Sequence, residues 1–150
     1  MAAQKSPPVL WCDFQFWAVI MAALLFLFGL YLLSDPATDL TWPFNFPKEF
    51  LLLVLVYPVL EEIVFRGLLQ ERFHCWISYQ IPGLVSSSNL ATTLIFTAMH
   101  FIYHPPLWAA AVFIPSLIFG YFKDRYQSLK APIILHIFFN AGYFLIFFNP

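Results

Sequence analysis

Three charged residues form a group that the apolar sequence around them makes unusual. Residues 50–60 carry no charge; then come Glu61 and Glu62, three apolar residues and Arg66. On a helix, Glu62 and Arg66 are four residues apart and can pair on one face. Glu61 lies about 100° around the helix from Glu62, so it cannot share that pairing fully. A desolvated carboxylate binds a proton more tightly and suits general-base chemistry near neutral pH; the alternative is an ordinary charge pair at the end of a membrane span.

The composition indicates that lipid surrounds most of this chain. Of its 150 residues, 61% are hydrophobic, 21% aromatic and 10% charged, and the mean hydropathy is +0.77. Soluble domains are about 25% charged, and a domain this small cannot cover so much apolar surface with one core. The net charge of -1 gives no electrostatic footprint for nucleic acid, so we expect the bilayer and no nucleic acid as partners. Charges at the centre of a span cost at least about 2.5–3.5 kcal/mol each and therefore need a function.

The apolar segments predict an all-α, polytopic transmembrane helical bundle with about five spans in a single membrane domain, residues 1–150. The expected spans are residues 14–33, 48–71, 89–103, 107–122 and 131–148, joined by segments 35–47, 72–88, 104–106 and 123–130. The first span contains no charge and has the length that crosses about 30 Å, and no cleavage site follows it, so we interpret it as a retained leading helix. Pro58 in the second span is expected to release a backbone carbonyl and bend the helix.

Positive charges between the expected spans predict the orientation. The side that holds the N-terminus carries five Lys and Arg residues, and the other side carries Lys48 alone. The five are Lys5, Arg72, Lys123, Arg125 and Lys130. Positive loops stay in the cytoplasm, so the N-terminus is expected there. Cys12 and Cys75 fall on the same side, where we expect free thiols.

Further polar residues lie inside the third and fifth expected spans. His100 follows Phe96 by four residues, and His136 and Asn140 share one helix face at the same spacing. At 1.5 Å per residue, these groups and Glu61 lie roughly 8–17 Å below the cytoplasmic surface. We therefore expect them to meet in one layer.

This set of side chains matches the needs of peptide hydrolysis without a covalent intermediate. A carboxylate and an imidazole can hold and deprotonate a water, and a second imidazole with an amide can stabilise an oxyanion. The chain has no HExxH and no GxSxG sequence. A metal held by Glu61, His100 and His136 is an alternative, because carboxylate and imidazole suit zinc.

Two non-enzymatic alternatives use the same residues. The polar layer can serve as hydrogen-bonding contacts between the helices of a scaffold or a bacteriocin-immunity protein. Intramembrane Glu and His also build proton relays and transporters, although the chain lacks the inverted repeat that many transporters carry.

Three motifs together resemble those of the CAAX prenyl-protease and bacteriocin-processing (CPBP, or Abi) family of glutamic intramembrane proteases. The motifs are Glu61-Glu62-x-x-x-Arg66, Phe96-x-x-x-His100 and His136-x-x-x-Asn140. The resemblance covers about residues 54–147 and includes the runs Gly120-Tyr121-Phe122 and Ala131-Pro132-Ile133. It implies a catalytic core within residues 48–148.

The resemblance also implies roles. Glu61 would be the base with His100 as its partner, His136 and Asn140 would hold the oxyanion, and Glu62, Arg66 and Phe96 would support them. The implied activity is intramembrane cleavage of a membrane-bound protein or peptide, with no cofactor and no metal. The chain is shorter than the larger members and is similar to small bacterial ones that process C-terminal sorting tails or CAAX-like ends. It would reside in a bacterial inner membrane.

Overall fold

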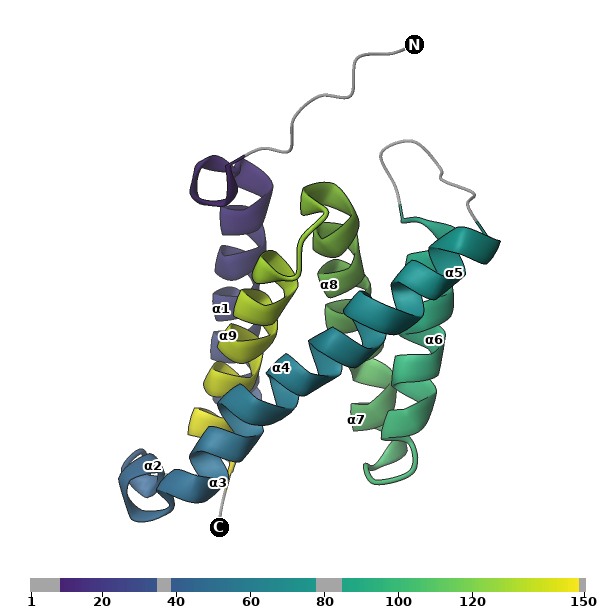
Figure 1. Cartoon of the computed structure of the whole chain (residues 1–150). Coiled ribbons are helices and arrows are strands. Elements are labelled where there is room, and N and C mark those ends of the chain that lie inside the picture. Colours follow the sequence, from purple (N-terminus) through teal and green to yellow (C-terminus); the bar gives the residue numbers. More distant parts are fainter. Residues whose placement is uncertain (1–8, 35–38, 78–84, 149–150) are drawn as a thin grey trace. The chain divides into compact units, whose positions relative to one another are not determined.

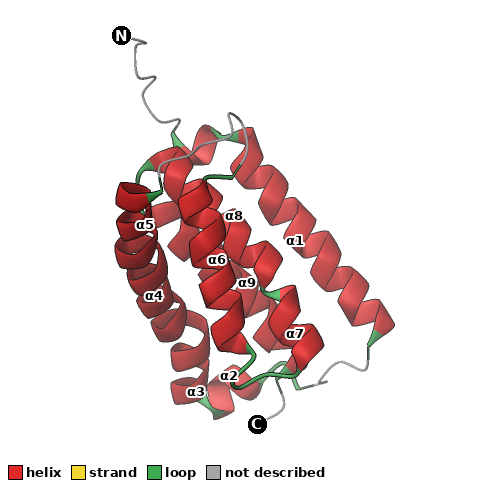
Figure 2. Ribbon diagram, turned by 90° about the vertical axis from the view of Figure 1, so that its right-hand side faces the viewer, coloured by secondary structure: helices red, strands yellow, loops and turns green. Residues whose placement is uncertain are grey.

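The computed structural model describes residues 9–34, 39–77 and 85–148, and the regular elements within these ranges are helices (Figures 1 and 2). The all-α fold class is thus confirmed. Lys5 and the short segments 35–38 and 78–84 lie outside the described residues. The chain divides into two compact units: the first is Met1–Val59 with Ile134–Pro150, and the second is Leu60–Ile133. Each is described by itself.

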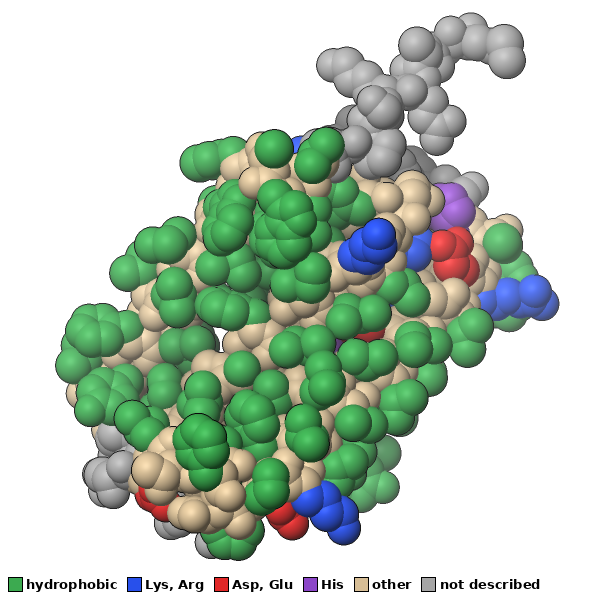
Figure 3. Space-filling view, turned by 60° about the vertical axis from the view of Figure 1, so that its left-hand side comes forward, with side chains coloured by type: hydrophobic (Ala, Val, Ile, Leu, Met, Phe, Trp, Pro, Cys, Tyr) green, Lys and Arg blue, Asp and Glu red, His purple; other side chains and the backbone are tan. Residues whose placement is uncertain are grey.

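Within the described residues, three helical segments are long and apolar enough to cross a membrane. They are α1 (Phe14–Leu33), the segment Pro106–Tyr126 formed by α7 (Pro106–Ala111) with α8 (Phe113–Tyr126), and α9 (Lys130–Phe147). These correspond to the first, fourth and fifth expected spans, whereas the second and third stay predictions. On the face drawn in Figure 3, hydrophobic side chains predominate, as a lipid-exposed surface requires.

The helix α1 of the first unit presents nearly all of its side chains outward. Only Phe16 and Leu27 are buried, while large side chains such as Phe14, Leu25 and Phe26 are exposed. The carboxylate of Asp13 caps its start by accepting from the Gln15 N–H at 3.0 Å. This helix meets the requirements of a lipid-facing span.

The segment 35–47, expected to be a loop, contains a short helix, and that expectation is wrong for its second half. Helix α2 (Trp42–Asn45) begins with Trp42, which is fully buried and donates its indole N–H to the Phe144 carbonyl at 3.1 Å. The indole also packs on Phe50 and Phe148, with ring centroids 5.5 and 4.5 Å away. Burial of so large a ring, with its one donor satisfied, favours order over a loop.

The longest helical run of the chain extends from Pro47 to Trp76. It consists of α3 (Pro47–Leu51), a π-helical segment η2 (Leu52–Val56), α4 (Tyr57–Glu62), a second π-helical segment η3 (Ile63–Leu69) and α5 (Gln70–Trp76) (Figure 1). The helix therefore continues past the expected end at residue 71. The first residues of the segment 72–88, including Arg72 and the exposed Cys75, are helical.

Pro58 explains a contact between two distant parts of the first unit. In the π-helical register, N–H groups bond five residues back, as the Tyr57 N–H does to the Leu52 carbonyl. The next residue, Pro58, has no N–H to give to Leu53. The amide of Asn140 on α9 donates to that Leu53 carbonyl at 3.0 Å. A candidate site residue thus satisfies the carbonyl that Pro58 leaves without a helical donor.

In the second unit, α6 (Ser87–His100) packs against both α5 and α8. The Ser86 hydroxyl caps α6 by accepting from the Asn89 N–H at 3.1 Å. Gly120 on α8 lets Asn89 approach closely, since a Cβ there would lie 1.9 Å from the Asn89 Oδ1. Small residues at such contacts are typical of membrane helix pairs.

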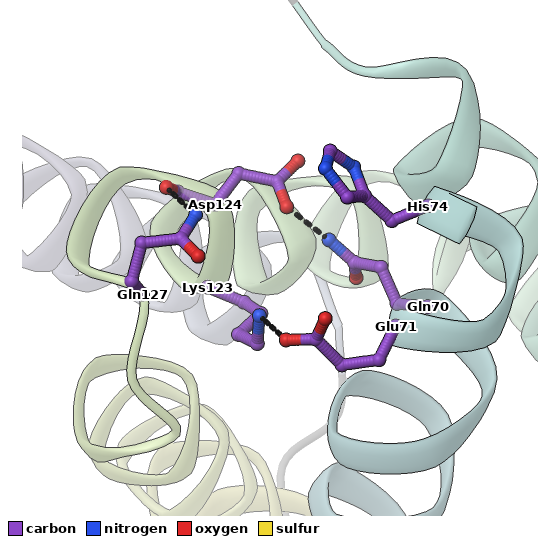
Figure 4. A pocket seen from close by; sticks show the side chains of 6 residues that line it. All are labelled: Gln70, Glu71, His74, Lys123, Asp124 and Gln127. Carbon is purple, nitrogen blue, oxygen red and sulfur yellow. Dashed lines mark hydrogen bonds and ion pairs between the residues drawn. The ribbon is translucent and has the colours of Figure 1, made fainter. Parts of the chain in front are cut away.

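Polar side chains hold the ends of α5, α6 and α8 together around a small hollow (Figure 4). The Gln70 amide donates to Asp124 at 2.8 Å, the Ser86 hydroxyl donates to the same carboxylate, and the buried Lys123 pairs with Glu71. Residues 123–126 were expected in a loop, which is wrong, because α8 ends only where Gln127 adopts a left-handed conformation with φ 49°. Cations in the last turn of a helix interact favourably with its dipole.

The contact of Gly120 with Asn89 predicts a large effect of a single methyl group. Gly120→Ala should lower the free energy of unfolding by about 2–4 kcal/mol, because Asn89 must give up its hydrogen bonds to make room. Gly29→Ala is the matched control, since no atom lies within 4 Å of a Cβ there. It should change stability by no more than about 1 kcal/mol. Thermal unfolding in detergent measures both, and equal stability of the two variants would contradict the close packing.

Candidate active site

The Glu62–Arg66 pair is the centre of the candidate site in the second unit. Arg66 Nη1 lies 3.1 Å from Glu62 Oε1, and both side chains are 0% exposed. The pairing expected from their spacing is confirmed. It spans the junction of α4 with the π-helical segment η3, an irregularity common at functional sites.

The remaining contacts of Arg66 come from α6 and α8. Its Nη2 donates to the Ser116 carbonyl at 2.9 Å and to the Ser116 hydroxyl at 2.7 Å. The guanidinium lies 4.8 Å from the ring centroid of Phe96 and 5.5 Å from that of Phe119. Two aromatic faces and three hydrogen bonds to Nη1 and Nη2 replace part of the hydration that a buried cation loses. The contact of the Phe96 ring with the guanidinium gives a physical basis for the supporting role proposed for Phe96.

Ser116 is a residue that the sequence reasoning missed. It lies in an apolar stretch, and the predicted function did not use it. The signal was its spacing from Gly120, four residues along the same helix, because a small-xxx-small pattern predicts close approach of a neighbouring helix.

Glu61 precedes this pair and differs from Glu62 in exposure. It is half-buried, whereas Glu62 is completely enclosed, so water can reach Glu61 more readily. The charge of Glu61 also acts on Arg66. The two adjacent carboxylates therefore occupy different environments, and chemistry that needs water favours Glu61.

His100 at the end of α6 has a defined tautomer. Its Nδ1 lies 2.8 Å from the Phe96 carbonyl oxygen. A carbonyl can only accept, so Nδ1 carries the hydrogen of this bond. The ring packs on Phe96 at 4.4 Å and stacks with His104 and Trp108 at 5.7 and 5.9 Å. His104 and Trp108, which sequence reasoning did not place at the site, thus fix the orientation of this imidazole.

The other two candidate residues lie on α9 in the first unit. His136 is buried, and Asn140 uses one amide hydrogen on the Leu53 carbonyl. The structure brings Glu62, Arg66 and Phe96 into direct contact within the second unit, with His100 packed on Phe96. A single layer that also includes His136 and Asn140 stays a prediction. In the described part of the chain, no group of three or more His, Cys, Asp or Glu side chains is arranged to hold a metal ion.

Comparison with known sequences decides the family. The profile of the type II CAAX prenyl endopeptidase Rce1-like family matches residues 42–142. The chain belongs to this family. The matched range contains all seven candidate residues, and the resemblance seen in the three motifs is confirmed. Together with its apolar helices, membership makes the chain an integral membrane protein.

A relative was also found in Escherichia coli, where it is described as an uncharacterized 24.3 kDa protein. It is 27% identical over 135 residues, which cover 81% of this chain and 58% of the relative. The chain therefore spans a little over half the length of that protein. No solved structure matches the chain.

The burial of the ion pair predicts an asymmetric response to its removal. Arg66→Met should lower the free energy of unfolding by about 3–5 kcal/mol, because it leaves the Glu62 carboxylate enclosed without its cation. Glu62→Gln combined with Arg66→Met should recover part of that loss, since no buried charge remains. Thermal unfolding in detergent compares the variants with Arg72→Met, which removes a cation from an exposed position on α5. A double variant less stable than Arg66→Met would contradict the argument.

Proposed function

We propose that this protein is an intramembrane endopeptidase that hydrolyses a peptide bond of a membrane-associated protein or peptide. The observation that carries the proposal is the fully buried Glu62–Arg66 ion pair beside the half-buried Glu61, in a member of this family. An enclosed, paired carboxylate suits a supporting role, and its more accessible neighbour suits contact with water. In this assignment Glu62 and Arg66 orient the helix turn and Glu61 is the general base.

The proposed reaction uses one water and no covalent intermediate. Glu61 removes a proton from the water, which also donates a hydrogen bond to the lone pair on His100 Nε2. The resulting hydroxide adds to the scissile carbonyl carbon. His136 and Asn140 donate hydrogen bonds to the oxyanion, and the proton held by Glu61 passes to the departing amine as the carbon–nitrogen bond breaks. The products are a carboxylic acid and an amine.

The substrate class that we propose is supported by the family and by the membrane location. We propose a C-terminal membrane sorting tail or a CAAX-like end as the cleaved segment, with residues 48–148 as the catalytic core, within a single membrane domain, residues 1–150. The positive charges counted on the expected side of the N-terminus, which include Arg72, Lys123, Arg125 and Lys130, support a cytoplasmic N-terminus in a bacterial cell membrane. Binding to the bilayer then concentrates enzyme and substrate in the same layer.

The catalytic role of Glu61 is tested by cleavage in liposomes. The probes are a farnesylated CAAX peptide and membrane proteins encoded beside this chain's own gene. Glu61→Ala should lower kcat at least about a hundredfold, because it removes the general base, while the melting temperature stays near that of the wild type. Glu49→Ala, which removes an exposed carboxylate on α3, is the matched control and should cleave normally.

The same assay separates the water mechanism from a metal-dependent one. Each variant is measured with and without a strong chelator. Cleavage that survives the chelator and is lost with Glu61 supports the proposal. Cleavage that stops with the chelator would assign the reaction to a metal, and cleavage retained by Glu61→Ala would remove Glu61 from the mechanism.

A further inference from the structure

A continuous line of hydrogen bonds leads from the candidate site into the core of the second unit. It starts at Arg66, whose Nη2 donates to the Ser116 hydroxyl at 2.7 Å. The Ser116 hydroxyl lies 3.2 Å from Thr93 Oγ1, which lies 3.1 Å from Asn89 Oδ1. The Asn89 amide then donates to the Leu117 carbonyl at 2.9 Å. This line of hydrogen bonds joins η3, α6 and α8 through side chains and ends on a backbone carbonyl of α8.

Arg66 sets the donor-to-acceptor direction of each hydrogen bond in the line from Ser116 to Leu117. A guanidinium has donors and no acceptor, so the hydrogen of the Ser116 hydroxyl must point away from it. That hydrogen goes to Thr93, whose own hydrogen goes to Asn89 Oδ1, and the Asn89 amide nitrogen is left to donate to a carbonyl. Within this line, the side chains of Ser116, Thr93 and Asn89 each accept once and donate once, so none of them can turn without breaking the next bond.

The side chains that form this line of hydrogen bonds are also buried. Arg66, Ser116, Thr93 and Asn89 are each 0% exposed, so water does not compete for their hydrogen bonds. Buried hydrogen bonds in a low dielectric are strong, and bonds to a charged group are the strongest of them. Gly120 permits this arrangement by leaving space for the Asn89 amide.

We propose that Ser116 is a positioning residue, which holds the Arg66 guanidinium and thereby sets the orientation of Glu62 and of the helix turn that carries Glu61. The effect of Ser116 on catalysis rests on the proposed function, whereas its effect on the position of Arg66 does not. Ser116 contacts Arg66 with both its carbonyl and its hydroxyl, and only the hydroxyl depends on the side chain. Removing the hydroxyl therefore loosens the guanidinium without releasing it.

The first arm of the test is independent of activity. Melting temperatures are measured for Ser116→Ala, Thr93→Val and the double variant. If Ser116 and Thr93 act through the same line of hydrogen bonds, the decreases in melting temperature of the two single variants are not additive. The double variant then melts at a clearly higher temperature than the sum of the two decreases gives. Thr92→Val is the matched control. Thr92 is a buried neighbour whose hydroxyl bonds only to the Ser88 carbonyl of its own helix, so its loss should add to that of Ser116→Ala.

The second arm measures cleavage of the substrate that the wild type accepts. Ser116→Ala should lower kcat about tenfold with KM within twofold, and Ser116→Thr, which keeps the hydroxyl, should recover most of that loss. Thr92→Val should keep the kcat of the wild type. A general loss of structure would lower the amount of folded protein for Ser116→Ala and Thr92→Val alike, so it would not produce this pattern.

The outcomes separate the two proposals. Additive melting losses for Ser116→Ala and Thr93→Val would overturn the positioning role, whatever the activity. Overlapping losses with an unchanged kcat would overturn its part in catalysis while the endopeptidase stands. A wild type that cleaves none of the probes would count against the proposed function and the catalytic effect, and the melting comparison would still decide whether Ser116 holds Arg66.

Discussion

The arrangement of the second unit depends on keeping one cation and one anion out of contact with both lipid and water. The Glu62–Arg66 pair is completely buried, so its Coulomb attraction must offset the loss of hydration of two charges. That balance improves as more of the donors and faces of the guanidinium find partners. Ser116, Phe96 and Phe119 supply partners for Nη2 and for the aromatic contacts from two neighbouring helices, whereas the buried Nε has no acceptor among the described residues. The position of α6 and α8 around η3 is therefore coupled to a single side chain.

Much of this centre could be predicted because it depends on local spacing. The interval between Glu62 and Arg66 predicts their pairing on any helix, and the apolar composition predicts an all-α membrane fold. The same reasoning placed Phe96 one helical turn before His100, and the contact between their rings follows from that interval. What sequence alone could not supply is the partner that arrives from elsewhere in the chain. Ser116, fifty residues after Arg66, is such a partner.

The π-helical segments show a second limit of sequence reasoning. In a π-helix each N–H bonds to the carbonyl five residues earlier, whereas in an α-helix it bonds to the carbonyl four residues earlier. The helix type therefore decides which carbonyl a proline leaves without a donor. An α-helical register assigns Pro58 to the Val54 carbonyl, whereas the register of η2 assigns it to Leu53. The contact between Asn140 and Leu53 could not be predicted without that shift. Helices α5 and α8 likewise extend beyond the expected span ends at residues 71 and 122, because helices accept charged residues such as Arg72 and Lys123 at their ends.

Lipid provides little hydrophobic force to press one apolar helix against another, so specific contacts must do so. The first unit uses a buried indole and an amide, each bonded to a backbone carbonyl of a distant segment. The second unit uses series of hydrogen bonds between side chains, and these series start from charged groups, the Arg66 guanidinium and the Asp124 carboxylate. Charge-assisted bonds are stronger and more directional than neutral ones. The unit that carries Glu61, Glu62 and His100 thus has the charge-assisted contacts, which is what the proposed mechanism requires if a base and a water are to keep a fixed geometry.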